Sequence, residues 1–405
     1  MLCRICNKKI SRTFTNLGKS PLANSYLEKE NINEKYYPLK VYYCKNCFLP
    51  QLPQHFHAKK IFKNYDYFSS YSTSWLNHCK KFVDEVIFDL KLNKKKKICE
   101  IASNDGYLLQ YFKKKNFCVL GVEPAVNVAR VAIKSKKIPT EIKFFGLNNA
   151  LAIKKKYGFQ DLIICNNVLA HVPNIMDFVR GLKSLLSEQG VVTIEFPHFY
   201  NLIKKVQFDT IYHEHFSYLS LTALKKLFEK FELNIFNVKK LKTHGGSLRV
   251  YIKHKKNKNF FQNSSVIKII YKEKKSKIFS SKMFLKFNKK MNYMKNNTIR
   301  FLNNLRFKKK NIIIYGAAAK GNTFLNYCGI NKKLVNFAVD KSKSKVGKYL
   351  PGSKIPIYNI NKIYSAKPDY IMIMPWNLKD EIIKQVKKKN FKGKFVTFVP
   401  DIKVY

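Results

Sequence analysis

The residues best suited to chemistry lie close together in the stretch 208–218. Within it, the run Tyr212-His213-Glu214-His215 brings two imidazoles, a carboxyl group and a phenol into four consecutive positions. A histidine with an acid to orient it is suited to act as a general base near neutral pH. Side chains at i and i+2 do not face each other on a helix, which disfavours a metal site formed by His213 and His215 there. We expect a general base, with a metal site or buried structural polar groups as alternatives.

Two further histidines lie in short segments rich in polar or small residues. His171 follows the segment 166–170, and it is either a pocket residue or an ordinary half-buried histidine. His244 precedes Gly245 and Gly246, whose missing side chains allow the backbone to approach a neighbour or a ligand closely. We expect His244 to lie beside the substrate.

A strand–turn–helix unit in the middle of the chain is typical of a nucleotide-binding site. The apolar segment 96–102 contains Glu100, and the turn 103–106 leads into an expected helix. The next apolar segment ends at Glu123, which follows Gly106 by 17 residues, where a carboxylate can bind both hydroxyls of a ribose. We expect these residues to contact the cofactor: Glu100, Ala102, Ser103, Asn104, Gly106, Glu123, Asn166 and Asn167.

The type of cofactor follows from what this turn lacks. A dinucleotide site carries Gly-x-Gly-x-x-Gly, but Ala102 and Asn104 stand where the first two glycines would be. The fourth expected strand is also followed by two asparagines, Asn166 and Asn167. We therefore expect S-adenosylmethionine, with NAD as the alternative.

Four of the nine cysteines form two pairs near the start of the chain, Cys3-x-x-Cys6 and Cys44-x-x-Cys47. Each pair can present two thiolates from one tight turn, and four thiolates complete the closed tetrahedral shell of a structural zinc ion. A redox pair or unliganded cysteines are the alternatives. The odd total and the scattered positions of the remaining cysteines argue against a disulfide framework.

A second strand–turn–helix unit begins near residue 311. The apolar run 312–315 leads into a Gly-Ala turn with Lys320 at the start of the expected helix, and a second strand ends at Asp340. Lys320 is placed to meet a phosphate, with the helix N-terminus adding a favourable dipole. A docking domain that retains only the turn is the alternative.

Apolar periodicity and these motifs predict an α/β fold with Rossmann-like central and C-terminal parts behind a small zinc-binding domain. We predict four segments: a zinc-binding domain with an aromatic connection at 1–74, a methyltransferase domain at 75–254, a Lys-rich helical connector at 255–309 and a Rossmann-like domain at 310–405. The connector should form one or two amphipathic helices packed on a domain. The aromatic and hydroxyl-rich run 65–75 is equally compatible with a lid over a ligand and with a packed surface between domains.

The charge of +53 raises the question of nucleic acid binding. Most of the 78 basic residues are lysines spread along the chain, whereas proteins that read base edges rely on arginine. We expect solvated lysine surfaces that steer anionic substrates inward, and no nucleic-acid partner. Neither a membrane-spanning run nor a signal peptide is expected, so we place the protein in the cytoplasm.

Together these motifs resemble the sugar C-methyltransferases of deoxysugar biosynthesis, including 3-C-methyltransferases of branched sugars. The likeness covers nearly the whole chain and rests on the paired cysteines and on the following segments: 65–75, 100–106, 166–171, 212–215, 243–247 and 315–321. It implies a zinc-binding domain, a central S-adenosylmethionine domain and a C-terminal Rossmann-like domain. A sugar nucleotide would lie between the last two.

The resemblance also implies roles for individual residues. His215 would be the base that removes a proton from carbon beside a ketone, Tyr212 a polar or proton-relaying partner, and Glu214 an orienting residue. His171 would face the same pocket, and Tyr67 would contact the substrate together with His244 and Lys320. The substrate would be a nucleotide-linked 4-keto-6-deoxy sugar. Transfer to oxygen or nitrogen of a nucleotide sugar, a zinc-containing nucleic-acid-binding protein and a binding module without catalysis are the alternatives. The oligomeric state stays open, and a monomer is compatible with the sequence.

Overall fold

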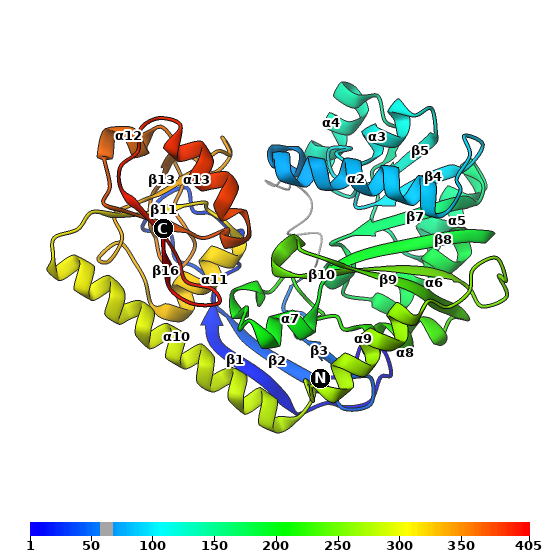
Figure 1. Cartoon of the computed structure of the whole chain (residues 1–405), viewed down its shortest axis with the longest axis horizontal. Coiled ribbons are helices and arrows are strands. Elements are labelled where there is room, and N and C mark those ends of the chain that lie inside the picture. Colours follow the sequence, from blue (N-terminus) through cyan, green and yellow to red (C-terminus); the bar gives the residue numbers. More distant parts are fainter. Residues whose placement is uncertain (57–67) are drawn as a thin grey trace.

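The structure is a computed structural model that describes residues 1–56 and 68–405. In these residues the strands form three sheets that follow one another along the chain. Figure 1 shows two lobes, built on the central and C-terminal sheets, with the small N-terminal sheet running between them. The predicted fold class is confirmed, while the exact boundaries at residues 74, 254 and 309 stay predictions.

The N-terminal sheet is antiparallel and has the order β1-β2-β3. Its strands are β1 (Thr13–Ser20), β2 (Tyr37–Cys44) and β3 (Leu49–Gln51). In β2 the residues Leu39, Val41 and Tyr43 are buried while Pro38, Lys40 and Tyr42 are more exposed, which is the period of two expected for a strand with one packed face.

The central sheet has the order β6-β5-β4-β7-β8-β10-β9, parallel as far as β8. Its strands are β4 (Lys97–Ile101), β5 (Cys118–Val122), β6 (Thr140–Glu141), β7 (Gln160–Asn166), β8 (Leu186–Pro197), β9 (Leu233–Leu241) and β10 (Ser247–His254). The helices α2 (Thr73–Asp89) and α3 (Leu109–Lys114) share a core with Ile98, whereas α5 (Leu147–Tyr157) and α6 (Ile175–Leu185) share a core with Cys99. Because adjacent strand residues point to opposite faces, the helices cover both sides of the sheet.

Three further helices complete the central part. These are α4 (Val126–Lys136), α7 (Phe199–Lys204) and α8 (Leu221–Glu229). Glu273 accepts hydrogen bonds from the first two backbone amides of α8, Leu221 N and Thr222 N, at 2.8 and 2.9 Å. It therefore satisfies donors that a helix start leaves without a partner inside the helix.

The C-terminal sheet has the order β13-β12-β11-β14-β15-β16 and is parallel except for β16. Its strands are β11 (Ile312–Tyr315), β12 (Ala338–Asp340), β13 (Ile357–Asn359), β14 (Tyr370–Ile373), β15 (Lys394–Thr397) and β16 (Lys403–Val404). Its helices are α11 (Ala319–Cys328), α12 (Lys362–Ala366) and α13 (Lys379–Lys387).

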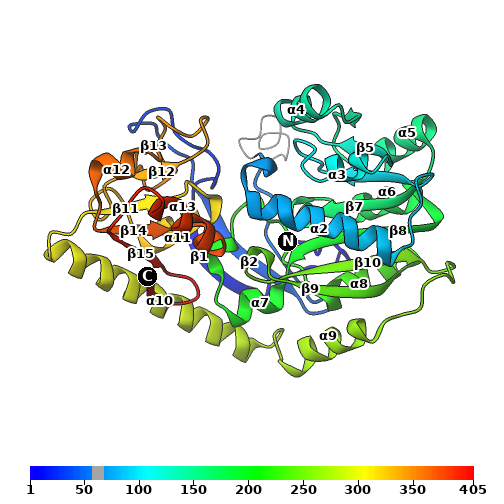
Figure 2. The same cartoon turned by 45° about the horizontal axis from the view of Figure 1, so that its top comes forward.

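Two helices, α9 (Ser264–Lys275) and α10 (Ser281–Phe307), occupy the Lys-rich connector. Figure 2 shows α10 running along the underside of the C-terminal lobe. Its apolar stripe packs on the N-terminal sheet, where Phe14 meets Phe284 and Phe287 at centroid distances of 5.0 and 4.9 Å. No helix in the described part of the chain is long and apolar enough to cross a membrane.

Five short turns lie at the ends of strands and helices where the two lobes and the N-terminal sheet approach one another. They are η1 (Ser69–Tyr71), η2 (Leu169–His171), η3 (Phe208–Thr210), η4 (Thr243–Gly245) and η5 (Trp376–Leu378). Because one apolar core joins Phe14, Phe208 and Phe324, packing holds the three parts together at η3.

Candidate functional site

The turn after β4 keeps a glycine-like backbone without most of the glycines. Ala102 and Asn104 both adopt positive φ, at 59° and 48°, and Gly106 follows at 73°. For residues with a side chain this left-handed conformation costs about 1–2 kcal/mol each. The fold therefore tolerates strain where a cofactor would approach the backbone, as such strain often marks functional sites.

Glu123 lies against this turn from the end of β5. Its two carboxylate oxygens accept hydrogen bonds from Asn104 N and Ala125 N, each at 2.9 Å. Burial raises the pKa of Glu123 to about 7, while these two amides oppose the shift. Each oxygen keeps a further lone pair, which suits it to accept from ribose hydroxyls.

Several buried polar atoms beside the turn have no hydrogen-bond partner among the described residues. They are the hydroxyl of Ser103 and both amide atoms of Asn166. Buried polar groups are normally paired, so such a group of unpaired atoms fits a bound polar molecule. Burial raises the pKa of Glu100 well above its usual value, and the phenol of Tyr107 opposes this shift. These residues fit the amino, carboxyl and hydroxyl groups of S-adenosylmethionine.

The segment that precedes α2 covers the same turn. Ser69 N donates to Asn104 Oδ1 at 2.9 Å, and Ser70 N donates to Asp105 Oδ2 at 3.3 Å. Ser72 then caps α2 by accepting from Trp75 N. The contacts favour a cover over the cofactor turn for residues 69–75. Tyr67, the predicted substrate contact, lies outside the described residues.

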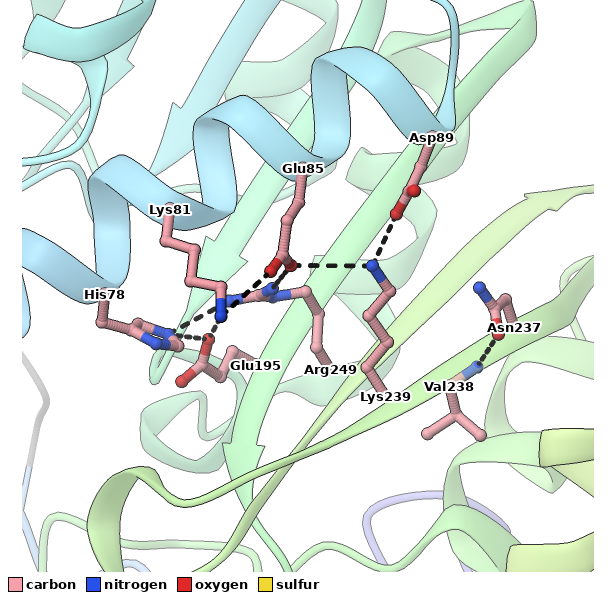
Figure 3. A network of polar contacts seen from close by, with 9 residues as sticks. All are labelled: His78, Lys81, Glu85, Asp89, Glu195, Asn237, Val238, Lys239 and Arg249. Carbon is pink, nitrogen blue, oxygen red and sulfur yellow. Dashed lines mark hydrogen bonds and ion pairs between the residues drawn. The ribbon is translucent and has the colours of Figure 1, made fainter.

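A buried ionic network, drawn in Figure 3, attaches α2 to the central sheet. Glu195 of β8 pairs at 2.9 Å with both His78 of α2 and Arg249 of β10. Burial alone would raise the pKa of Glu195, but His78 and Arg249 hold it at about 2. Thr243 of η4 donates to the second oxygen of Glu195 at 2.8 Å, so the network also fixes the loop that carries His244.

His215 is held in one tautomer by the backbone. Its Nδ1 lies 2.7 Å from the carbonyl oxygen of Thr210. A carbonyl can only accept, so Nδ1 carries the proton and Nε2 keeps its lone pair. Burial lowers the pKa of His215 well below its usual value, and His171 lowers it further. The imidazole is therefore neutral and able to accept a proton at pH 7.

The neighbours of His215 include two of the residues predicted with it. The ring of Tyr212 lies over that of His215 with centroids 3.9 Å apart, and the ring of His171 meets it edge-on at 4.6 Å. Burial lowers the pKa of His171 to about 4, with the backbone of Glu214 opposing the shift.

The orienting role expected for Glu214 is corrected by this geometry. Its carboxylate oxygens both accept from Asn24 Nδ2 at 2.8 Å, toward the N-terminal part, whereas the Thr210 carbonyl orients His215. Burial raises the pKa of Glu214 to about 7. His213 points elsewhere, with Nε2 3.3 Å from the carbonyl of Tyr37. Within the described residues, four cysteines form the one cluster able to hold a metal, so the alternative metal site at 213–215 gains no support.

The C-terminal lobe contributes a cation to this region. Lys320 lies in the first turn of α11. It donates to Asn377 Oδ1 at 2.6 Å and lies 4.8 Å from the centroid of the Trp376 ring. Burial lowers the pKa of Lys320, and Asp209 opposes the shift. The charge of Lys320 also lowers the pKa values of His215 and His244, which places the three groups in one electrostatic neighbourhood.

His244 also contacts residues on the side of the site where we expect the cofactor. Its Nε2 lies 3.3 Å from the amide nitrogen of Asn167, and its ring lies 5.5 Å from that of Trp75. The backbone of His244 has a positive φ of 48°, so the residue is strained into this position. The predicted cofactor residue Asn167 and the predicted substrate residue His244 thus meet directly.

The two cysteine pairs converge at the N-terminal sheet. All four sulfur atoms, of Cys3, Cys6, Cys44 and Cys47, lie within 4.8 Å of one another. Sulfurs bound at about 2.3 Å to one tetrahedral zinc ion lie about 3.8 Å apart. The Sγ atoms of Cys6 and Cys44 are 3.8 Å apart, so the donor set fits a closed structural zinc site.

The zinc-binding turn contacts the loop that carries His171. Arg4 donates from Nη1 to the carbonyl of Pro173 at 2.7 Å and from Nη2 to that of Leu52 at 2.7 Å. Arg4 N also donates to Gln51 Oε1 at 2.9 Å. A residue inside the first cysteine pair therefore anchors the chain two positions after His171.

Comparisons with known proteins find matches along nearly the whole chain. Residues 3–62 match a model described as "Putative zinc binding domain", residues 75–238 one described as "Methyltransferase domain", and residues 242–400 one described as "C-methyltransferase C-terminal domain". C-methyltransferase NovU of Streptomyces niveus is 30% identical over 405 residues, which are 99% of this chain and 96% of the relative. The chain belongs to this C-methyltransferase family.

This C-methyltransferase uses S-adenosylmethionine and carries one structural zinc, as the sequence predicted. Solved structures similar to part of it include an S-adenosylmethionine-dependent methyltransferase from Clostridium acetobutylicum, with 14% identity, a TM-score of 0.36 and coverage of 44% of this chain and 92% of that one. Another is magnesium protoporphyrin IX methyltransferase from Synechocystis, with 15% identity, a TM-score of 0.36 and coverage of 50% and 100%.

Sequence reasoning overlooked several residues of this C-methyltransferase that fix the site. Asn24, Asp209, Thr210 and Trp376 act through contacts between distant segments, which spacing does not reveal. Glu195 and Arg249 did leave a signal, because Glu195 lies in the apolar run 191–196 and Arg249 lies between the apolar residues Leu248 and Val250. Such residues are almost never fully buried unless they are paired.

Proposed function

We propose that this C-methyltransferase methylates a carbon beside the ketone of a nucleotide-linked 4-keto-6-deoxy sugar. The observation that carries the proposal is the state of His215, whose Nε2 lone pair is left available by the 2.7 Å bond from Nδ1 to Thr210. Methyl transfer to carbon needs such a base, because a carbon beside a carbonyl becomes nucleophilic only when it loses a proton.

In the proposed reaction each bond that breaks is matched by a bond that forms. The C–H bond beside the ketone breaks, its proton goes to His215 Nε2, and its electron pair forms the enolate. S-adenosylmethionine supplies the methyl group, and the new C–C bond forms as the C–S bond breaks. His215 then returns the proton to solvent, which restores the base.

Each remaining predicted residue has a proposed place in this reaction. Tyr212, whose ring lies against that of His215, is proposed as the polar partner at the enolate oxygen, and His171 as a wall of the same pocket. Lys320 is proposed to meet the diphosphate, because it combines a positive charge with the N-terminal end of α11. His244 and Tyr67 are proposed to contact the sugar.

The cofactor would lie on the turn after β4. We assign its contacts to the residues predicted for it, namely Glu100, Ala102, Ser103, Asn104, Gly106, Glu123, Asn166 and Asn167. The unpaired buried atoms of Ser103 and Asn166 support this assignment. The hydrogen bond between Asn167 and His244 would then bring the methyl donor, S-adenosylmethionine, beside the sugar.

Methyl-labelled S-adenosylmethionine and a panel of thymidine-, uridine- and guanosine-linked 4-keto-6-deoxyhexoses test the proposal. We expect label on a ring carbon by NMR, and solvent deuterium entering that carbon when the donor is absent. His215→Ala should lose both signals by 10²-fold or more, about what a general base contributes. His213→Gln is the matched control, because His213 faces Tyr37. Label on oxygen or nitrogen, or exchange that survives His215→Ala, would overturn the proposal.

A further inference from the structure

The turn η3 is held by the C-terminal lobe on one side. Phe208 packs on the rings of Phe324 and Tyr327 of α11, at centroid distances of 5.8 and 5.0 Å. Asp209 accepts a hydrogen bond from Trp376 Nε1 at 2.7 Å, although 167 residues separate the two. The first two residues of η3 are therefore fixed by contacts from outside the central sheet.

The third residue of the turn holds His215. The carbonyl of Thr210 accepts from His215 Nδ1 at 2.7 Å. The turn itself is closed by three bonds. Thr210 Oγ1 and Thr210 N donate to the carbonyl of Gln207 at 2.7 and 3.2 Å, and Ile211 N donates to that of Phe208 at 2.9 Å. The Thr210 carbonyl belongs to the peptide whose N–H, on Ile211, closes the turn on Phe208, so a backbone shift at Asp209 within this closed turn would also move that carbonyl relative to His215.

The indole of Trp376 has little freedom to move. A Cβ atom added at Gly245 would lie 2.3 Å from its Cη2 atom, so the ring lies tightly against the loop that follows His244. Lys320 lies 4.8 Å from the centroid of the ring. The N–H of Trp376 is thus aimed at Asp209 by contacts on more than one side.

Asp209 is buried beside this donor. The residue is 1% exposed, and burial raises the pKa of its carboxyl group, while Lys320 and then the hydrogen bond from Trp376 oppose the shift. A buried carboxylate that loses a hydrogen bond pays a desolvation cost that is larger than for a neutral group. Removal of the indole N–H should therefore move Asp209 rather than leave the turn in place.

We propose that Trp376 is a positioning residue for methyl transfer: its indole N–H, acting through Asp209, fixes the Thr210 carbonyl and with it the tautomer and direction of His215. The inference rests on the proposed function, in which His215 Nε2 takes the proton. Trp376 itself does not touch the reacting atoms in this scheme. The C-terminal lobe would thereby control the base that the central part carries.

The test combines Trp376→Phe, which keeps a ring but loses the N–H, with NMR of the protein labelled with ¹⁵N in its histidines. In the parent protein we expect His215 as a single tautomer with its proton on Nδ1. In Trp376→Phe we expect both tautomers, and a kcat for a 4-keto-6-deoxyhexose nucleotide lower by about 10- to 100-fold, since small misplacements of catalytic groups cost this much. The KM for S-adenosylmethionine should change less than threefold.

Two substitutions at Asp209 separate positioning from general damage. Asp209→Asn keeps an oxygen that accepts from Trp376, and it should retain the single tautomer and a kcat within about threefold. Asp209→Leu removes the acceptor and should behave like Trp376→Phe. Asp209→Leu also provides the test if Trp376→Phe does not fold. Tyr315→Phe is the control in the same lobe, because its hydroxyl contacts Gln385 rather than η3.

The outcomes distinguish the inference from the function on which it rests. If His215→Ala is inactive while Trp376→Phe and Asp209→Leu keep the single tautomer and the parent kcat, the inference is wrong and the proposed base stands. If His215→Ala keeps full turnover, the proposed base is wrong. Two results together support both the inference and the proposed base. The tautomer of His215 shifts in Trp376→Phe, and kcat shows no further loss when Trp376→Phe is combined with His215→Ala.

Discussion

The ring of His171 meets the ring of His215 edge to face, with centroids 4.6 Å apart and planes inclined by 64°. A proton on either imidazole would repel a proton on the other. Burial and this neighbour together keep the pKa of His215 well below 6.5, and burial brings that of His171 to about 4. Both rings are therefore neutral at pH 7, which is the state that a base must have before it acts.

The first prediction concerns pH. The rate should fall as pH falls through the pKa of His215, because protonation removes the base, and this limb should lie below pH 6.5 in the parent enzyme. His171→Asn removes an imidazole whose protonated form repels a proton on His215, so the pKa of His215 should rise and the limb should move to higher pH. The measurement is the pH profile of kcat/KM for each enzyme, scaled to its own maximum.

His213→Gln is the control for this profile, because it changes an imidazole that contacts Tyr37 rather than His215. Its acid limb should stay at the parent position. An acid limb that moves to lower pH in His171→Asn would contradict the assigned coupling between the two rings.

The second prediction concerns the strained turn after β4. Ala102→Gly should raise the free energy of unfolding by about 0.5–1 kcal/mol, since release of the left-handed strain exceeds the entropic cost of glycine. The backbone that approaches the cofactor should not change, so the KM for S-adenosylmethionine should stay within about twofold. Urea unfolding and initial rates measure the two effects. A loss of stability would show that Ala102 is not strained.

How much the sequence could predict depended on whether the information was local. Each cysteine pair and the turn 102–106 is a short local motif, so the spacing within each motif indicates a metal site and a cofactor site. The hydrogen bond from His215 to Thr210 was not predictable, because every residue has a carbonyl and the choice among them depends on the fold. For the same reason Glu214, next to His215 in sequence, was assigned an orienting role that its contact with Asn24 does not support.

The link between Asp209 and Trp376 was equally out of reach for sequence reasoning. Nothing at position 209 indicates a partner 167 residues away. The strand around Glu195 shows the opposite case, since a lone acid in the apolar run 191–196 demands a buried partner, and Arg249 in the apolar strand β10 offers one. A charged residue inside an apolar strand was therefore the readable sign of the network in Figure 3.

The third prediction joins the zinc site to the loop of His171. Removal of zinc with a chelator should lower kcat by at least 10-fold, because Arg4 then no longer holds the carbonyl of Pro173 in place. Arg4→Gln should lower kcat in the same direction while it retains one zinc ion per chain. The measurements are zinc content by atomic absorption and hydrogen exchange of residues 169–174.

Lys8→Gln is the control for Arg4→Gln, because Lys8 is an exposed basic residue of the same zinc-binding turn. It should leave exchange and kcat unchanged. Normal activity in the zinc-free protein, with exchange of residues 169–174 also unaltered, would contradict the link.

The fourth prediction concerns the buried pair Glu195–Arg249. Glu195→Ala should lower the free energy of unfolding by about 3–5 kcal/mol, because it leaves the guanidinium of Arg249 buried without its carboxylate. Lys115→Ala breaks an exposed pair with Asp84 on the same helix α2, and exposed pairs contribute at most about 1 kcal/mol. Urea unfolding compares the two variants.

The same substitution should also affect the cofactor site, since Glu195 holds both α2 and Thr243. A loosened α2 no longer keeps Ser69 and Ser70 on the turn that contains Asn104, so the KM for S-adenosylmethionine should rise by about 10-fold or more in Glu195→Ala. The hydrogen bond from Thr243 holds the loop of His244, so kcat should fall as well. If the variant lost stability but kept both kinetic constants, the network would support the fold without positioning the site.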